Sequence, residues 1–286
     1  MVRLVGSIDK GVLYVVATPI GNLGDISARS IAVLQQVDLI AAEDTRHTKP
    51  LLHHMGIATP LFAMHEHNEQ AQLDGLIERL GAGQSIALVS DAGTPLISDP
   101  GFLLVRECHR SGIRVSPVPG ACAAVAALSV SGLPPDRFRF EGFPPRTASA
   151  RQQFFRGLLA EDATLLFYES SHRIVASLAD MSMVFGGDRR AVLVRELTKI
   201  HETILSAQLS ELSAIVERDS NQSKGEIVVL VAGARKDCDS VAAEAERVLD
   251  ILRETLPLKQ AVSLAARISG EKKNRLYQLA LKNERQ

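Results

Sequence analysis

The chain has 286 residues, of which 46% are hydrophobic and 23% charged, and its formal net charge is −1. This length suffices for two domains of ordinary size, and the composition is that of a globular protein. No apolar run is long enough for a membrane span, and the N-terminus lacks the apolar segment of a secretory signal. The three cysteines lie far apart without paired spacing, so we expect no disulfide framework, no zinc site and a cytoplasmic location.

The charge is unevenly distributed along the chain. From Pro257 onward there are seven basic residues and two acidic ones, a local excess of about +5 against about −6 for the remainder. A basic tail is compatible with a solvated helical surface or with a polyanionic partner. Charge alone does not choose between these two interpretations.

Short apolar runs alternate with amphipathic stretches in the first part of the chain, which predicts α/β structure with a mostly parallel sheet. The runs that predict strands are residues 13–17, 38–41, 60–63, 86–89 and 114–116. The stretches that predict helices are residues 25–36, 45–55 and 69–80. We therefore expect an N-terminal α/β lobe over residues 1–118.

A second α/β lobe is expected over residues 119–233, with a mixed sheet as one option. It begins with an alanine-rich helix at 121–130, and its strands are expected at 137–140, 164–168, 191–194 and 226–231. A polar linker at 234–240 precedes three short helices at 241–254, 258–268 and 271–281. The last two could form a helix-turn-helix or a docked helical hairpin, so residues 240–286 are expected to be a basic helical tail.

Two loops that follow predicted strands are candidate ligand sites. Residues 90–101 contain two acidic residues, two glycines and two prolines, which predicts a stiff loop beyond the strand at 86–89. Small ligands bind at this edge of open α/β sheets. The loop at 17–25 lacks both the dinucleotide fingerprint and the P-loop lysine, so a phosphate-tailed nucleotide is disfavoured there.

Five segments in this order give the chain a specific resemblance. They are Thr18-Pro19-Ile20-Gly21-Asn22-Leu23-Gly24-Asp25, Glu43-Asp44-Thr45-Arg46, residues 90–101, Tyr168-Glu169-Ser170-Ser171-His172-Arg173 and Arg195-Glu196-Leu197-Thr198-Lys199. Over about residues 11–233 the chain resembles the tetrapyrrole methylase (class III) superfamily of S-adenosylmethionine-dependent methyltransferases. The resemblance is strongest to members that methylate a ribose 2′-hydroxyl of a cytidine in the decoding centre of 16S ribosomal RNA.

The resemblance implies a fold, a donor site and partners. It implies two lobes with S-adenosylmethionine between them, a homodimer, and small-subunit ribosomal RNA or the assembled 30S subunit as substrate. The residues that correspond to the donor site are Ile20, Gly21, Asp91, Gly93, Thr94, Ala121, Cys122, Tyr168, Glu226 and Ile227. Cys122 could equally be a small core residue.

A ribose hydroxyl is a weak nucleophile, so a base or a positioning cation is expected near it. The candidates are Glu43, Asp44 and Arg46, which follow a predicted strand, although one of the acids could simply cap the next helix. The sequence does not choose between Glu43 and Asp44. His65 and His67 could suggest a metal, but no third ligand is identifiable and methyl transfer needs none, so we expect no metal.

Arginines interleaved with aromatic residues suit a folded RNA. The candidate RNA-binding residues are Arg137, Arg139, Arg146, Arg151, Arg173, Lys272, Lys273 and Arg275. The first two could instead lie on the wet face of a half-buried strand, and Arg173 could form a structural ion pair with Glu169. The alternative functions are a methylase acting on a tetrapyrrole precursor and a nucleic-acid-binding regulator that does not catalyse.

Overall fold

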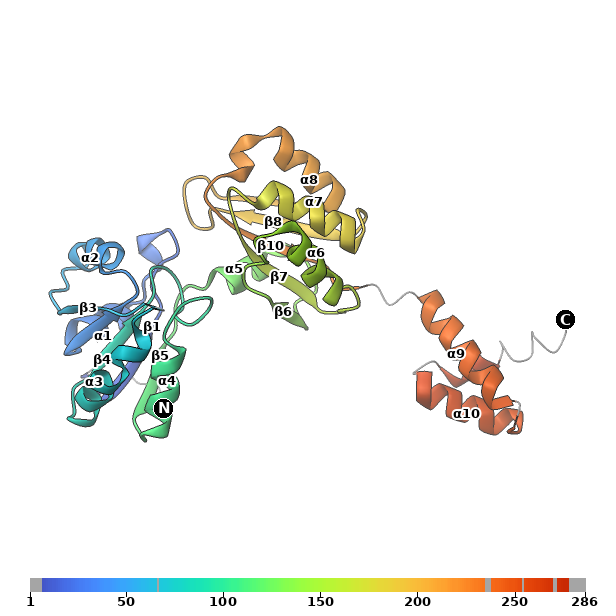
Figure 1. Ribbon diagram of the computed structural model, residues 1–286, viewed down its shortest axis with the longest axis horizontal. Coiled ribbons are helices and arrows are strands. Elements are labelled where there is room, and N and C mark those ends of the chain that lie inside the picture. Colours follow the sequence, from blue (N-terminus) through green and yellow to red (C-terminus); the bar gives the residue numbers. More distant parts are fainter. Residues whose placement is uncertain (1–6, 66, 235–237, 254, 270–271, 278–286) are drawn as a thin grey trace. The chain divides into compact units, whose positions relative to one another are not determined.

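The computed structural model describes residues 7–65, 67–234, 238–253, 255–269 and 272–277, and these form two compact units (Figure 1). The first unit spans Met1–Ala232 and the second Gly233–Gln286. The first contains two five-stranded sheets, which confirms the α/β class. None of the described helices is both long and apolar enough to cross a membrane.

The first sheet is entirely parallel, with strand order β3-β2-β4-β1-β5. Its strands are β1 (Val12–Val16), β2 (Leu39–Ala42), β3 (Leu61–Ala63), β4 (Ile86–Val89) and β5 (Arg114–Val118). Each lies within two residues of the range expected from its apolar run. Because the strands are parallel, the loops that follow β1, β2 and β4 all lie at one edge of the sheet.

Side chains alternate between the two faces of this sheet, as the period of a strand requires. Tyr14 and Val16 pack with Leu34 of α1 (Ala28–Gln36) and Leu52 of α2 (Thr45–His54). Leu13, on the other face, packs in a cluster with residues of α3 (Glu69–Gly81) and α4 (Phe102–Arg110). Both faces are therefore covered by helices, and the carboxyl edge is left for the loops.

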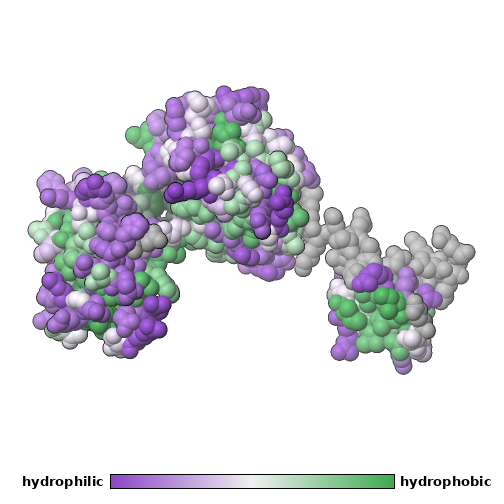
Figure 2. Space-filling model, in the orientation of Figure 1, coloured by the Kyte–Doolittle hydropathy of each residue, from purple (hydrophilic) through white to green (hydrophobic). Residues whose placement is uncertain are grey.

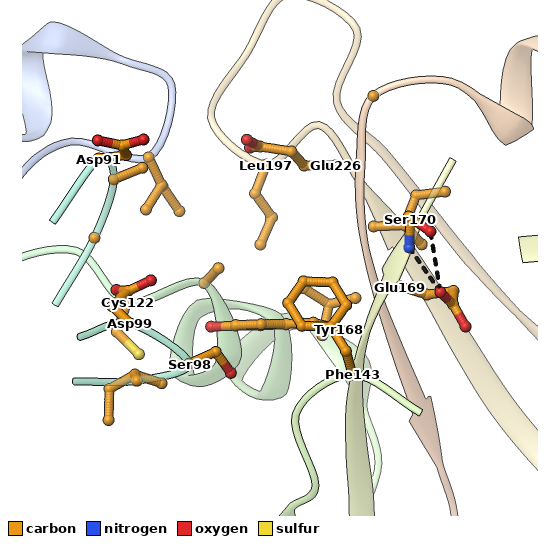
Figure 3. Close-up of a pocket in the computed structure, with 18 of the residues that line it drawn as sticks. Asp91, Ser98, Asp99, Cys122, Phe143, Tyr168, Glu169, Ser170, Leu197 and Glu226 are labelled. Carbon is orange, nitrogen blue, oxygen red and sulfur yellow. Dashed lines mark hydrogen bonds between the residues drawn. The ribbon is translucent and has the colours of Figure 1, made fainter. Parts of the chain in front are cut away.

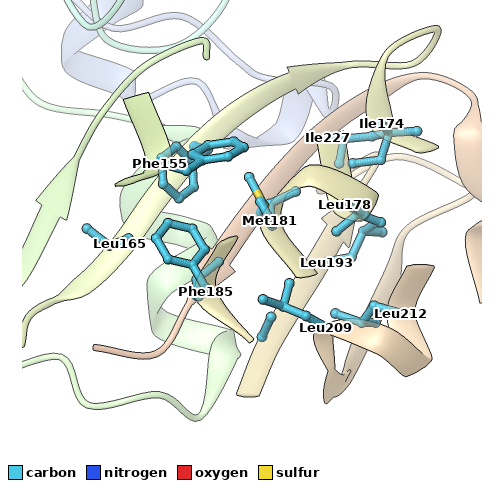
Figure 4. Close-up of a cluster of buried hydrophobic side chains, with 14 of the residues drawn as sticks. Phe155, Leu165, Ile174, Leu178, Met181, Phe185, Leu193, Leu209, Leu212 and Ile227 are labelled. Carbon is cyan, nitrogen blue, oxygen red and sulfur yellow. The ribbon is translucent and has the colours of Figure 1, made fainter. Parts of the chain in front are cut away.

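The second sheet is mixed, with strand order β6-β7-β10-β8-β9 and only β6 and β7 parallel. Its strands are β6 (Phe138–Phe140), β7 (Thr164–Ser170), β8 (Arg190–Arg195), β9 (Thr203–Gln208) and β10 (Glu226–Val231). The alanine-rich helix α5 (Ala123–Ser131) packs on one face. The other face carries the largest apolar cluster, with side chains of α6 (Ala148–Gly157), α7 (Ile174–Phe185) and α8 (Leu209–Arg218) (Figure 4).

Several elements differ from the sequence expectations. The helix expected from residue 25 is a short 3-10 turn, η1 (Leu23–Asp25), followed by α1, because the Ser27 hydroxyl caps α1 at the Ser30 amide. α5 begins at Ala123 rather than residue 121. A second 3-10 turn, η2 (Ser220–Ser223), precedes β10. Sequence reasoning identified neither the edge strand β9 nor the helices α4, α6, α7 and α8.

The C-terminal unit is helical. It contains α9 (Cys238–Arg253), α10 (Leu258–Ser269) and helical residues 273–277. α9 begins within the expected linker. Ala245, Leu249, Ala261 and Leu276 are buried in one small core, so the three segments pack on each other. The rest of the helix expected at 271–281 lies outside the described residues.

Candidate functional site

A cavity of about 520 Å³ lies where loops at the carboxyl edge of the first sheet meet the second sheet (Figure 3). From the first sheet's loops it is lined by Ile20, Glu43 and residues 91–94 and 97–99. The remaining lining residues are Cys122, Ala123, Phe143, residues 168–172, Val194, Leu197 and residues 225–228. This volume is within the range of about 300–1,000 Å³ that is typical of small-molecule sites.

Backbone hydrogen bonds join the loops that follow β1 and β4. The Thr18 amide donates to the Gly93 carbonyl (2.9 Å), and the Gly93 amide donates to the Thr18 carbonyl (3.1 Å). The Thr94 hydroxyl donates to the Ala121 carbonyl (2.9 Å), which adds the segment after β5. Three loops from different strands are thus fixed to one another at the cavity wall.

Gly93 is required by this arrangement. Its φ of +82° lies in the left-handed region, and a Cβ there would be 3.2 Å from Cγ2 of Ile20. Further along the same loop, Leu96 and Ser98 also have positive φ values, 73° and 71°. Such conformations cost of order 1 kcal/mol each in residues with a side chain, and they concentrate at functional sites. The loop is therefore held in a specific, strained shape.

Three carboxyl groups line one side of the cavity: Glu43, Asp91 and Asp99. Burial, followed by the nearby Glu43 charge, raises the pKa of Asp99 to about 6. Burial also raises the pKa of Glu43, and the neighbouring charges of Asp91 and Asp44 act in the same direction. This wall would favour a cationic ligand, because a positive charge would relieve the repulsion among the carboxylates.

Both oxygens of Asp91 already have protein partners. Oδ1 accepts a hydrogen bond from the Asp44 amide (3.1 Å), and Oδ2 lies 2.8 Å from Nδ1 of His47. This carboxylate raises the pKa of His47 through the hydrogen bond and its charge. Asp91 therefore connects the cavity wall to the first turn of α2.

Of the acidic and basic candidates that follow β2, only Glu43 lines the cavity. Asp44 accepts a hydrogen bond from the Arg46 amide (2.8 Å) as the cap of α2 and pairs with the Arg46 guanidinium (2.6 Å). The hydrogen bonds from Arg46 hold the pKa of Asp44 well below its usual range. The Arg46 side chain is 86% exposed, so this pair lies at the protein surface.

Aromatic and aliphatic side chains of the second lobe also line the cavity. Tyr168 extends across it toward Cys122 and Asp99 and is packed edge-on against Phe143 (Figure 3). The Tyr168 hydroxyl accepts a hydrogen bond from the Ala124 amide (3.2 Å). Burial raises the pKa of Tyr168 to about 12, so the phenol is neutral. Tyr168 and Phe143 thus provide an apolar surface with one hydroxyl group, and the polar residues 169–172 and Glu226 also line the cavity.

Two of the expected donor contacts, Gly21 and Ala121, are not among the residues that line the cavity. A Cβ on Gly21 would overlap the Lys199 side chain, so the glycine lets this lysine cross the first loop. Lys199 Nζ bonds Glu196 (2.9 Å) and Glu226 (3.0 Å). Ala121 takes part through its carbonyl, as described above. The other eight expected donor residues line the cavity.

Most of the expected RNA-binding arginines have carboxylate partners. Arg137 pairs with Asp162, Arg139 with Glu141 and Glu161, Arg151 with Asp180, and Arg173 with Glu169. Arg151 is also buried, with 4% of its surface exposed, and its Nε donates to Asp180 at 2.8 Å. Arg146 is exposed and accepts a hydrogen bond from Arg151 through its carbonyl. These contacts connect the helices and loops around the second sheet. Of the five expected RNA-binding arginines, only Arg146 forms no ion pair with the described residues.

The three candidate RNA-binding residues of the second unit lie on its surface. Lys272, Lys273 and Arg275 are exposed, while the neighbouring Leu276 is buried in the helical core. Among the described residues, no group of three or more histidine, cysteine or acidic side chains is placed to hold a metal ion.

Sequence reasoning missed several lining residues. Ser98 and Asp99 belong to the candidate ligand loop 90–101, and Leu197 belongs to one of the five segments that carry the family resemblance. The sequence therefore pointed to the regions that contain these three residues. Phe143 lies in the Phe143-Pro144-Pro145 segment among the candidate RNA-binding arginines, whereas Gly225 comes from a connection with no recognisable local pattern. Gly225 is required because a side chain there would overlap Glu196.

Comparison with known proteins agrees with this architecture. The family model described as "Tetrapyrrole (Corrin/Porphyrin) Methylases" matches residues 12–213, and the model described as "RsmI C-terminal HTH domain" matches residues 239–284. Among solved structures, uroporphyrin-III-C-methyltransferase from Thermus thermophilus has a TM-score of 0.56 at 19% identity, covering 78% of this chain and 94% of that one. Diphthine synthase has a TM-score of 0.58 at 18% identity, covering 77% and 90%. At these identities the likeness concerns the fold alone.

Sequence relatives are much closer. Ribosomal RNA small subunit methyltransferase I of Pseudomonas aeruginosa is 58% identical over 278 residues, which is 96% of this chain and 99% of the relative. The protein of the same name from Escherichia coli O157:H7 is 54% identical and covers 96% of both chains. The chain therefore belongs to the tetrapyrrole methylase family and, within it, to the ribosomal RNA small subunit methyltransferase I family.

Proposed function

We propose that this protein transfers a methyl group from S-adenosylmethionine to the ribose 2′-hydroxyl of a cytidine in the decoding centre of 16S ribosomal RNA. The observation that carries the proposal is the identity of 58% and 54%, over nearly the full chain, to two proteins named as small-subunit ribosomal RNA methyltransferases. The helical C-terminal unit matches the domain model of the same family, which supports an RNA substrate.

The cavity suits the proposed donor. Its carboxylate side, with Glu43, Asp91 and Asp99, is complementary to a sulfonium and an ammonium group. Its apolar side, which includes Cys122, Tyr168 and Ile227, is complementary to an adenine ring, and the Tyr168 hydroxyl adds one polar contact. We therefore assign donor binding to Ile20, Asp91, Gly93, Thr94, Cys122, Tyr168, Glu226 and Ile227, with Gly21 and Ala121 shaping the surrounding backbone.

Methyl transfer to a ribose hydroxyl requires that the hydroxyl oxygen be aligned with the methyl carbon and that the hydroxyl proton be removed. When bound, the donor supplies a methyl carbon activated by a positively charged sulfur. The ribose oxygen forms its new bond to this carbon as the carbon–sulfur bond breaks, and the hydroxyl proton must leave. We propose that the Glu43 carboxylate accepts this proton, because Glu43 lines the cavity and has a raised pKa. Asp44 is a poorer base because its pKa is depressed by Arg46.

Direct measurement of the product tests the proposal. Small ribosomal subunits from cells that lack this protein are incubated with the purified enzyme and tritiated donor, and the RNA is digested with alkali. We expect label in an alkali-resistant dinucleotide, which marks ribose methylation. Label confined to a base would refute the 2′-hydroxyl assignment, and the absence of label with intact donor binding would favour a non-catalytic regulator.

A tetrapyrrole precursor is the second candidate substrate. The chain shares the fold of a uroporphyrin-III-C-methyltransferase, but at 19% identity this likeness does not extend to substrate. The match of residues 239–284 to the HTH domain favours RNA. Turnover of a porphyrinoid precursor and none with small subunits would reverse this preference.

The domain organisation belongs to the same proposal. We propose that residues 1–118 and 119–233 act as two lobes, with residues 240–286 as a helical unit that contacts RNA through Lys272, Lys273 and Arg275. A homodimer and a cytoplasmic location stay predictions, the first from the family resemblance and the second from the cysteine content.

A further inference from the structure

The exposed surface of α2 combines positive charge with proximity to the cavity. Glu43 lines the cavity, Asp44 caps α2, and the helix begins at Thr45. We define the α2 cation face by the five basic or imidazole side chains that this helix carries, namely Arg46, His47, Lys49, His53 and His54. The helix contains no acidic residue over Thr45–His54.

Helical geometry places these side chains on one surface. Thr48 and Leu52 are buried against the first sheet, whereas all five members of the α2 cation face are exposed. At about 100° per residue the five lie within about 160° of arc, opposite the buried pair. The surface over α2 is correspondingly hydrophilic in Figure 2. From Arg46 to His53 the face extends about 10 Å along the helix axis.

The α2 cation face differs in its ion pairing from the five candidate RNA-binding arginines of the second lobe. Four of those five arginines are paired with carboxylates, and one pair is buried. On α2, Arg46 pairs with its capping Asp44 and His47 with Asp91. Within the described part of the chain, Lys49, His53 and His54 form no ion pair. Lys49 therefore gives the α2 cation face a formal positive charge that no carboxylate of the described residues pairs with.

We propose that the α2 cation face binds phosphates of the RNA substrate and positions the backbone that flanks the target ribose. This inference rests on the proposed function, because it takes RNA to be the substrate. The occupant is RNA backbone rather than an acidic protein segment, since the face offers cations and imidazole donors but no exposed large apolar side chain. Phosphate contacts of this kind fix the register of a nucleic acid without reading its sequence.

Reversing one charge tests the proposal. Lys49→Glu changes the centre of the face, and Arg156→Glu is a matched control that makes the same charge change on α6, also at an exposed helical position. Both proteins would be compared with wild type by circular dichroism, donor calorimetry, and methylation of unmodified small subunits. Binding to protein-free 16S ribosomal RNA would be measured at several salt concentrations.

We expect Lys49→Glu to raise KM for small subunits by about tenfold. The decrease of log affinity with log salt should become less steep, by about one in the magnitude of the slope. Arg156→Glu should change KM less than twofold, and donor affinity should be unchanged in both variants. Equal KM values for all three proteins would overturn the inference while leaving the proposed function intact. Weaker binding to subunits with unchanged binding to protein-free RNA would also overturn it, in favour of a ribosomal protein contact. Failure of the wild type to methylate small subunits would refute the proposed function instead.

Discussion

Replacing Asp99 with asparagine should stabilise the protein above pH 6 and weaken its binding of a cationic donor. The Asp99 carboxyl is half-buried at the cavity wall, beside Glu43 and Asp91. Burial and these two negative charges disfavour its ionised form, whereas a hydrogen bond from Ser90 partly favours it. Asparagine keeps the shape of the side chain and removes the charge.

The magnitude follows from the pKa. Folding raises the pKa of Asp99 from 3.8 to about 6. The folded state therefore holds its proton more tightly than the unfolded state, and the contribution of this group to stability falls as pH rises from about 4 to 6. Two pKa units correspond to about 3 kcal/mol. The stability gained on Asp99→Asn should be small at pH 4 and rise toward an upper limit of about 3 kcal/mol at pH 7, which solvent screening lowers because the carboxyl is only half-buried.

Urea unfolding of wild type and variant between pH 4 and 8 measures this difference directly. Asp74→Asn removes an exposed carboxyl of α3 and serves as the control for a simple change in net charge. Isothermal calorimetry with S-adenosylmethionine should show proton release near pH 6 in wild type and less in the variant, because a bound cation favours ionised Asp99. A stability difference that is the same at pH 4 and pH 7 would refute the claim that this carboxyl is desolvated.

Two further substitutions probe contacts that the sequence did not reveal. Gly21→Ala should displace Lys199 and weaken donor binding about tenfold by calorimetry, whereas Gly75→Ala, which meets no atom within 4 Å on α3, should keep donor affinity and leave stability equal or higher. Unchanged affinity in the first variant would show that the lysine does not shape the site. Arg151→Met should cost about 3–5 kcal/mol in urea unfolding because it leaves the Asp180 carboxylate buried without its partner, and a loss below 1 kcal/mol would contradict the buried ion pair.

The first sheet was predictable because its signals are local. The inner strands β1, β2 and β4 are continuous apolar runs, since strands covered on both faces need apolar side chains at every position, whereas the edge strand β5 also contains Arg114 and Ser116. The edge strand β9 was missed for the opposite reason. Ile204, Ser206 and Gln208 are exposed while the intervening residues are partly buried, so no continuous apolar run marks the strand.

The candidate site likewise has features that the local sequence predicts and features that it does not. The loop 90–101 could be singled out because glycine and proline mark a rigid loop at a strand end, whereas Asp91, Gly93 and Thr94 were assigned within it from the family resemblance. The Arg173–Glu169 pair could be predicted from its i,i+4 spacing, but the partners of Arg137 and Arg151 could not, because these carboxylates are distant in sequence. Arg137 and Asp162 are 25 residues apart, and Arg151 and Asp180 are 29 apart. Such pairs depend on which helices and strands pack together.

Asp91 shows how the donor site and the proposed RNA surface depend on one another. Its two oxygens hold the Asp44 amide and His47, and Asp44 in turn caps α2 and pairs with Arg46. The strained loop 90–101 therefore supplies both a wall of the cavity and the support for the first turn of α2. A displacement of this loop that breaks the Asp91 contacts would also release the start of the cation face. The glycines and left-handed residues of the loop thus matter beyond the donor, because the same backbone sets the position at which the RNA backbone is proposed to bind.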